Sequence, residues 1–239
     1  MSPRKPERLW NHTYDYLRGQ IAQMSTGHNR LEPEEELTRR LGVSRATVRE
    51  ATQALVQEGY VTRRHGKGNF AHPSVASLGY RMDLTSDFIR LLDTGEGAVL
   101  CRNLRSAFGH CRESMRQRFP APCSAVYEQD WLYQTGERPM IFCRVSLPEE
   151  MLLRPPRPAG PDESLFSWVQ TYCGRDFAYY ATHLGCRGDP DAARALALPA
   201  GQVMLNWQEI FYDLSDTPVA FCDVFFHPEH MDLTMVLRP

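Results

Sequence analysis

The sequence predicts an α+β protein in two parts, a small helical head followed by a larger body built on an antiparallel sheet. Three observations support this prediction. Apolar residues recur every three or four positions between residues 9 and 59, which is typical of amphipathic helices. Residues 60–71 change to two strand-like runs around a glycine-rich turn. Beyond residue 80, strands joined by turns are mixed with short helices, which favours an antiparallel sheet.

Three helices are expected in the head, and the second and third lie close together in the sequence. Apolar spacing predicts the first helix over residues 9–24. Pro33 suits the first turn of the second helix, because an N–H there has no acceptor within the helix, and Gly42 ends it. Ser44 is a good N-cap for the third helix, which Gly59 ends. Two helices joined by such a short turn form a helix-turn-helix.

A β-hairpin is expected directly after the third helix. Residues 60–63 and 69–71 are strand-like, and residues 65–68 form the turn. A helix-turn-helix followed by such a hairpin is a winged helix. We therefore predict a winged helix-turn-helix DNA-binding domain over residues 1–72, a linker over residues 73–79 and a second domain over residues 80–239.

The second domain is expected to alternate helices with hairpin-linked strands. The predicted helices cover residues 85–92, 164–172 and 189–196. The predicted strands cover residues 123–134, 140–147, 177–184, 203–212 and 219–226, with a last one over residues 232–237.

Composition excludes several classes of protein. The chain has 239 residues, of which 42% are hydrophobic and 23% are charged, as in ordinary globular proteins. No apolar run approaches the ~20 residues that span a bilayer, and residues 1–10 lack the apolar core of a secretory signal. The seven cysteines are widely spaced and include no CxxC pair. This favours reduced thiols in a cytoplasmic protein over disulfides or a zinc site.

Charge is divided unevenly between the two parts. Residues 1–72 contain 12 basic and 8 acidic residues, a net charge of +4, and residues 73–239 contain 15 and 21, a net charge of −6. The head is therefore the part expected to meet a polyanion.

Two arginines at the start of the third helix are the main candidates for reading DNA. Arg45 and Arg49 are four residues apart on the face opposite Leu55. Arginine in the major groove pairs with guanine and contributes ~1–3 kcal/mol of discrimination, whereas the alternative is a solvated basic face. The hairpin tip is expected to contact the minor groove or the DNA backbone. The predicted DNA-binding residues are Ser44, Arg45, Thr47, Arg49, Arg63, Arg64, His65, Gly66, Lys67 and Gly68.

Residues 31–70 resemble the winged-helix domain of the GntR family of bacterial transcription regulators. The resemblance rests on residues 41–45 (LGVSR), 47–51 (TVREA), 58–59 (EG) and 66–68 (GKG). Residues 196–201 (LALPAG), 216–219 (DTPV) and 225–227 (FFH) are similar to the end of the UTRA effector domain of the HutC-type branch. This second resemblance implies a chorismate-lyase-like α+β fold that binds a small metabolite.

Two departures from the family pattern bear on function. The family commonly has a DNA-contacting arginine in the second helix where this chain has Glu35, a carboxylate that would repel a phosphate or favour a different base. Domains that take sugar phosphates have an Arg-x-Arg pair before the Gly-x-Pro turn, whereas residues 128–133 here read EQDWLY. Without the two arginines, this domain lacks the positive charge that would hold the phosphate of a sugar phosphate in the usual way.

The candidates for effector binding are polar residues near aromatic ones in the predicted sheet, namely Arg144, Tyr180, His183, Glu209, Tyr212, Asp223 and His227. Arg144 lies in an apolar strand and needs a partner, either an anionic ligand or a buried carboxylate such as Glu209. Residues 227–230 (HPEH) contain metal-ligand types without a third nearby ligand, so neither a metal nor a cofactor is predicted.

The resemblance implies a homodimeric, DNA-binding repressor that is regulated by a small metabolite and is not an enzyme. A homodimer would place two third helices in successive major grooves ~34 Å apart on operator DNA. Two alternatives remain open, a DNA-binding dimer without an effector and a lyase-like enzyme. The sequence contains no Ser-His-Asp arrangement, metal cluster or phosphate loop in favour of the enzyme.

Overall fold

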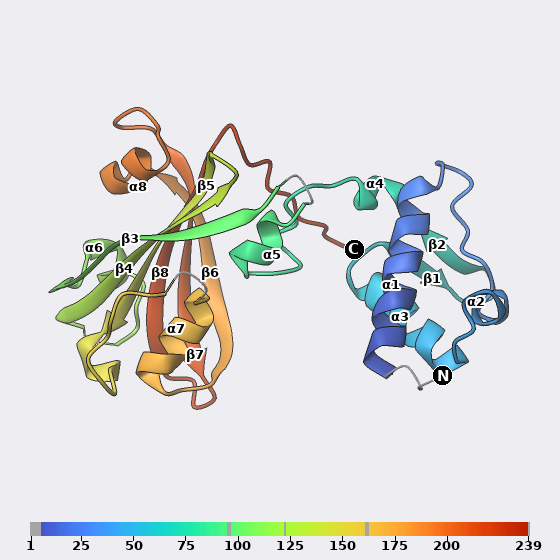
Figure 1. Ribbon diagram of the computed structural model, residues 1–239, viewed down its shortest axis with the longest axis horizontal. Helices are drawn as coiled ribbons and strands as arrows, with labels where there is room; N and C mark the ends of the chain where they lie inside the picture. The colour runs from blue at the N-terminus through green and yellow to red at the C-terminus, as the bar shows by residue number, and fades with distance from the viewer. Residues whose placement is uncertain (1–5, 95–96, 122, 161–162, 239) are drawn as a thin grey trace. The chain divides into compact units, whose positions relative to one another are not determined.

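The computed structural model describes residues 6–94, 97–121, 123–160 and 163–238. The chain forms two compact units, of which the first comprises residues up to Ser86 together with residues from Leu233 onward, and the second spans Asp87–Asp232 (Figure 1). Residues 1–5 of the predicted DNA-binding domain lie outside the described residues. All seven cysteines are free thiols. No helix in the described ranges has the length and apolar character that a membrane span requires.

The first unit is a winged helix-turn-helix. Its elements are α1 (Pro6–Gln23), α2 (Glu34–Leu41), α3 (Arg45–Gln57), β1 (Val61–Arg64), β2 (Gly68–Ala71) and α4 (Pro73–Ala76). The apolar faces of the three long helices meet in one core that includes Leu17, Leu37 and Leu55. Gly42 ends α2 in the left-handed conformation with φ at 64°, which allows the sharp turn into α3.

The last residues of the chain complete this first unit. Thr234 pairs with Arg81 in a parallel bridge, and the Met82 N–H donates to the Thr234 carbonyl at 3.0 Å. The Arg238 guanidinium donates to the carbonyls of Val56 and Gln57 at the end of α3. Residues 232–237 therefore form a single bridge where a strand was predicted. Because of these contacts, residues 80–86 and 233–238 group with the first unit.

The second unit contains a six-stranded antiparallel sheet with strand order β3-β4-β5-β8-β7-β6 (Figure 1). The strands are β3 (Val99–His110), β4 (Ala125–Thr135), β5 (Arg138–Pro148), β6 (Phe177–Arg187), β7 (Met204–Asp213) and β8 (Pro218–Phe226). The sequence analysis missed β3. This strand lies at an edge of the sheet, and a register shift between Asn103 and Arg105 interrupts its alternation.

Short helices cover both faces of the sheet. They are α5 (Phe88–Leu92), α6 (Glu113–Arg116), α7 (Leu165–Cys173) and α8 (Pro190–Ala195), and the 3-10 turn η1 (Glu149–Met151) follows β5. Trp168 of α7 packs against Trp131 on one face of the sheet. On the opposite face, Ala192 of α8 packs in a cluster with Phe142. Arg144 and its carboxylate partner Asp130, described below, lie on this second face.

Candidate DNA interface and effector site

The start of α3 presents two arginines outward. Ser44 caps the helix by accepting a hydrogen bond from the Thr47 N–H at 3.1 Å, and its hydroxyl also lies 2.9 Å from the Thr47 hydroxyl. The side chains of Arg45 and Arg49 are each 65% exposed, whereas Val48 is buried in the core. The cap fixes where the helix begins and therefore which residues face outward.

The hairpin forms the second part of the candidate interface. β1 and β2 pair from Val61–Ala71 to Arg64–Gly68, and the Lys67 N–H donates to the Arg64 carbonyl at 3.1 Å to close the turn. Gly66 and Gly68 have φ angles of 71° and 105°, which disfavour residues with a Cβ. The hairpin therefore places the side chains of Arg64, His65 and Lys67 at an exposed tip.

An open groove lies between α2, α3 and the hairpin, and it unites most of the predicted contacts. It is lined by Glu34, Arg49, Arg63, Arg64, His65, Gly66, Gly68 and Asn69. The predicted residues Ser44, Arg45, Thr47 and Lys67 do not line this groove. Arginines from the helix and from the hairpin thus converge on one surface, which suits the phosphates and base edges of a duplex.

Sequence reasoning placed Glu35 at this interface but missed the ion pairs that Glu34 and Glu35 make there. Glu34 Oε2 lies 3.2 Å from Arg49 Nη2, and its Oε1 lies 3.5 Å from Arg63 Nη2. Glu35 pairs with Arg45. The first glutamates of α2 also suit the positive end of the helix dipole, which is the role that the sequence alone suggests for Glu34. No local spacing links these residues to their partners, because the partners lie on other elements.

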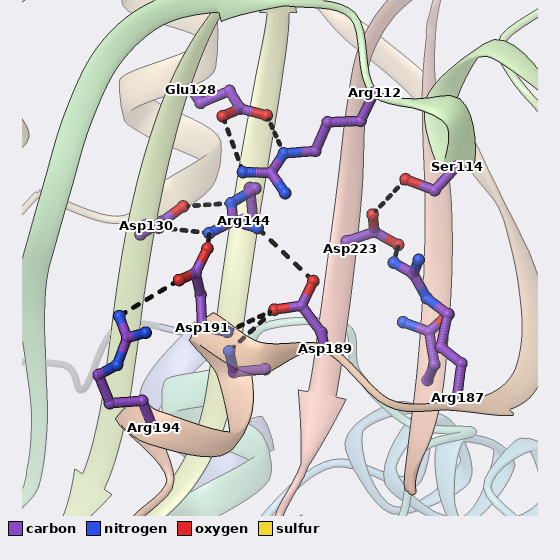
Figure 2. Close-up of polar contacts among 12 residues, drawn as sticks. Arg112, Ser114, Glu128, Asp130, Arg144, Arg187, Asp189, Asp191, Arg194 and Asp223 are labelled. Carbon is purple, nitrogen blue, oxygen red and sulfur yellow. Dashed lines mark hydrogen bonds and ion pairs between the residues drawn. The ribbon is translucent and has the colours of Figure 1, made fainter. Parts of the chain in front are cut away.

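In the second unit, Arg144 lies at the centre of a row of polar residues across the sheet. The strand register places Asp130 of β4, Arg144 of β5 and Asp223 of β8 directly beside one another. Arg144 donates from Nε and Nη2 to the two carboxylate oxygens of Asp130, both at 2.7 Å (Figure 2). Arg144 is 2% exposed and Asp130 4%. Its partner is therefore a buried carboxylate within the protein, Asp130 and not Glu209.

The start of α8 supplies two further carboxylates to Arg144. Asp191 Oδ2 accepts from Arg144 Nη2 at 3.0 Å, and Asp189 Oδ2 lies 3.8 Å from Nη1 (Figure 2). Burial alone would lower the pKa of Arg144, but Asp130 and Asp189 raise it, so the guanidinium stays charged. Burial opposes the charged form of Asp191 as well, yet Arg144 holds the pKa of that carboxyl below its usual value.

The surrounding carboxylates are also paired. Arg112 donates to Glu128 at 2.6 and 3.3 Å. Asp223 accepts from the Ser114 hydroxyl at 2.9 Å and pairs with Arg187 Nη2 at 2.7 Å (Figure 2). We call the set Arg112, Glu128, Asp130, Arg144, Arg187, Asp189, Asp191 and Asp223 the polar network. Each of its charges has an opposite charge beside it, so an anionic ligand at Arg144 would have to displace a carboxylate.

The remaining effector candidates are divided between the two faces of the sheet and the segment that follows β8. Glu209 pairs with Cys222, the neighbour of Asp223, so its side chain lies on the opposite face of the sheet. Tyr180 shares that face, where its ring lies near Phe166 of α7. His183 lies on the edge strand β6 opposite Gln208, which pairs with Asp223, so His183 shares the face of Arg144 and Asp223.

Tyr212 and His227 have local partners. The ring of Tyr212 stacks on that of Tyr179 at 4.8 Å. His227 follows β8 and stacks on His230 at 3.6 Å, while its Nδ1 accepts from the Glu229 and His230 N–H groups at 3.2 Å. Burial lowers the pKa of His227. Within the described ranges, no group of three or more potential ligands is arranged to hold a metal ion.

Glu209 is unusual among the carboxylates of this unit. It is 1% exposed, and the Thr182 hydroxyl donates to its Oε1 at 3.4 Å. Burial raises the pKa of Glu209 to about 8, although the Thr182 hydroxyl acts in the opposite direction. Burial therefore favours the protonated form of Glu209.

Comparisons with known proteins agree with this two-part architecture. A model described as bacterial regulatory proteins, gntR family, matches residues 9–70, and the UTRA domain model matches residues 113–232. No curated protein matches.

Two solved structures share the fold over nearly the whole chain. The possible transcriptional regulator YydK from Bacillus subtilis is 15% identical, with a TM-score of 0.65, over 95% of this chain and 99% of that one. PhnF from Mycobacterium smegmatis is 17% identical, with a TM-score of 0.55, over 95% and 99%.

Proposed function

Because the chain belongs to the GntR family of bacterial regulatory proteins and carries a UTRA domain, we propose that it is a homodimeric repressor released from its operator by a small metabolite. It is a DNA-binding transcription regulator with an effector-binding domain. The observation that best supports the proposed DNA contacts is the exposure of Arg45 and Arg49 at the capped start of α3, beside a glycine-tipped basic hairpin.

In the proposed complex, the start of α3 enters the major groove and the hairpin follows the minor groove or the backbone. Arg45 and Arg49 read base edges, and Ser44 and Thr47 contact phosphates near the helix N-terminus. Arg63, Arg64, His65 and Lys67 supply the positive charge of the hairpin, and Gly66 and Gly68 let its backbone approach the DNA. This complex forms in the cytoplasm, and the role of the protein is binding without catalysis.

The test is fluorescence anisotropy with a duplex from the intergenic region beside the protein's own gene, measured over a salt series. We expect sequence-selective binding whose affinity falls steeply with salt, because several phosphate contacts release counterions. Arg45→Ala and Arg49→Ala should each weaken selective binding by about 1–3 kcal/mol. If both variants bind like the wild type, α3 is not the recognition helix.

We propose that the dimer forms through the edge strand β6. This strand is 11 residues long and lies at the outside of the sheet. Tyr179, Tyr180 and Leu184 are 47%, 39% and 51% exposed there. A long exposed edge with apolar side chains is a template for pairing, and two antiparallel copies of β6 would bury these residues while extending the sheet.

The effector must bind the DNA-free form more tightly than the DNA-bound form, because equal affinity shifts nothing. The pairing of Arg144 with Asp130 offers no unpaired positive charge to a phosphate at that position. The same pairing favours, as the second candidate function, a DNA-binding dimer that takes no effector. Thermal shift with a metabolite library separates the two, since a ligand of the native state raises the melting temperature.

A further inference from the structure

We propose that Glu34 and Glu35 determine the DNA specificity of this protein by competing with DNA for the arginines that read it. This inference rests on the proposed contacts of Arg45, Arg49 and Arg63 with DNA. In the free protein these three side chains are each paired with a carboxylate of α2. Binding to DNA must therefore exchange an internal acceptor for an external one.

Glu34 is placed to act on both DNA-contacting elements at once. One of its carboxylate oxygens lies 3.2 Å from Arg49 of α3 and the other lies 3.5 Å from Arg63 of β1. Its side chain is 27% exposed, compared with 68% for Glu35, and it lines the groove between helix and hairpin. Arg63 is also held by Asn69, whose Oδ1 accepts from Arg63 Nε at 3.2 Å. Glu34 thus orients two arginines that come from different elements.

The carboxylates make binding to a wrong sequence unfavourable. When an arginine leaves for DNA, Glu34 or Glu35 remains close to the phosphates, where its negative charge is repelled. A base edge that accepts two arginine hydrogen bonds compensates for this loss, whereas a single phosphate contact compensates less. A cytosine amino group beside the carboxylate would also compensate, because carboxylates accept from cytosine N4. Random DNA supplies neither in the required position, so the carboxylates weaken non-specific binding most.

Glu36 provides a matched control. It follows Glu35 in the same first turn of α2 and carries the same charge, but no basic side chain in the described part of the chain pairs with it. Glu36→Gln therefore removes one negative charge and one favourable dipole contact, as Glu34→Gln and Glu35→Gln do, without releasing an arginine. Any effect of Glu34→Gln or Glu35→Gln on DNA binding beyond that of Glu36→Gln is therefore due to the loss of the ion pairs with arginine.

The experiment compares two probes, a random-sequence duplex and a duplex selected from a random library by the wild-type protein. Surface ion pairs of this kind change equilibria by a few-fold each. We expect Glu34→Gln and Glu35→Gln to bind the random duplex about two- to fivefold more tightly than Glu36→Gln does, with a smaller gain on the selected duplex. The selectivity ratio should fall by a similar factor, and selection repeated with Glu35→Gln should relax the preference at individual base pairs. Circular dichroism confirms that each variant is folded.

A double-mutant cycle identifies the cause. In an Arg49→Ala, Arg63→Ala background, Glu34→Gln should lose its excess effect, because no paired arginine remains for it to release. If Glu34→Gln and Glu35→Gln match Glu36→Gln on both duplexes, the inference is wrong while the proposed function stands. If Arg45→Ala and Arg49→Ala have no effect on either duplex, the proposed DNA contacts are themselves wrong.

Discussion

Removing Arg144 should destabilise the second unit more than any surface substitution. Arg144 and Asp130 are almost completely buried and share two hydrogen bonds of 2.7 Å. Truncating one member of such a pair leaves an unpaired buried charge and costs ~3–5 kcal/mol. We expect the cost of Arg144→Ala to lie near the upper end of this range, because Asp189 and Asp191 lose the same guanidinium. Replacing both partners with apolar residues, as in Arg144→Met with Asp130→Leu, should cost at most ~1–2 kcal/mol, since no unpaired charge then remains between the two strands.

The assay is urea unfolding followed by tryptophan fluorescence in a Trp10→Phe background. Trp131, Trp168 and Trp207 then report the second unit alone. With a urea dependence of ~2 kcal/mol per M, a loss of ~4 kcal/mol lowers the midpoint by about 2 M. A loss below ~1 kcal/mol for Arg144→Ala, or a double variant as unstable as the single one, would refute the argument. A stable double variant also tests ligand binding directly. If Arg144 contacts the effector, the double variant stays folded but its melting temperature does not rise when the effector is added.

Three further predictions concern other parts of the chain. Because the folded pKa of Glu209 lies above its unfolded value, the native state holds a proton that the unfolded state has lost. The free energy of unfolding should therefore fall by at most ~1.4 kcal/mol per pH unit between about pH 4.5 and about pH 8 and level off above. Glu209→Gln should flatten this pH profile, measured as urea midpoints. Leu184→Glu on β6 should shift the dimer toward monomer in light scattering, whereas Leu104→Glu on the opposite edge strand, with 41% exposure, should leave it unchanged. Arg238→Ala removes two hydrogen bonds and a cation from the C-terminal end of α3. We expect the first unit to lose about 1 kcal/mol of unfolding free energy and its melting temperature, followed by Trp10 fluorescence, to fall by ~4–8 °C. An unchanged melting temperature would show that the contact contributes nothing.

The DNA-binding unit could be predicted from the sequence because its signals are local. Ser44 caps α3 through a residue only three positions away, and Gly42 ends α2 in the left-handed conformation that the turn requires. Charge, caps and apolar spacing all indicate the same elements. The strand β3 lacked such signals, because an edge strand with arginines and exposed residues on both faces has no apolar alternation.

The polar sites depend on contacts between distant residues and could be predicted only in part. The sequence indicates that a charge at Arg144 needs a partner, but only the register of β4 against β5 selects Asp130 from the available carboxylates. Glu34 meets Arg49 and Arg63 because three elements converge, and no spacing along the chain encodes this meeting. The seven effector candidates were chosen by residue type, and the alternation of the strands separates them onto two faces.

The contacts of Thr234 and Arg238 with the DNA-binding unit can form only late in synthesis. The end of α3 receives Arg238, and Arg81 pairs with Thr234, only after residues 87–232 have been translated. At ~5–20 residues per second, a ribosome needs roughly 7–30 s for that interval. During it, a nascent DNA-binding unit lacks these stabilising contacts. A polypeptide released early, without its effector domain, would lack these contacts and would therefore be the form least able to occupy the operator. This matters because no metabolite could release such a form from the DNA.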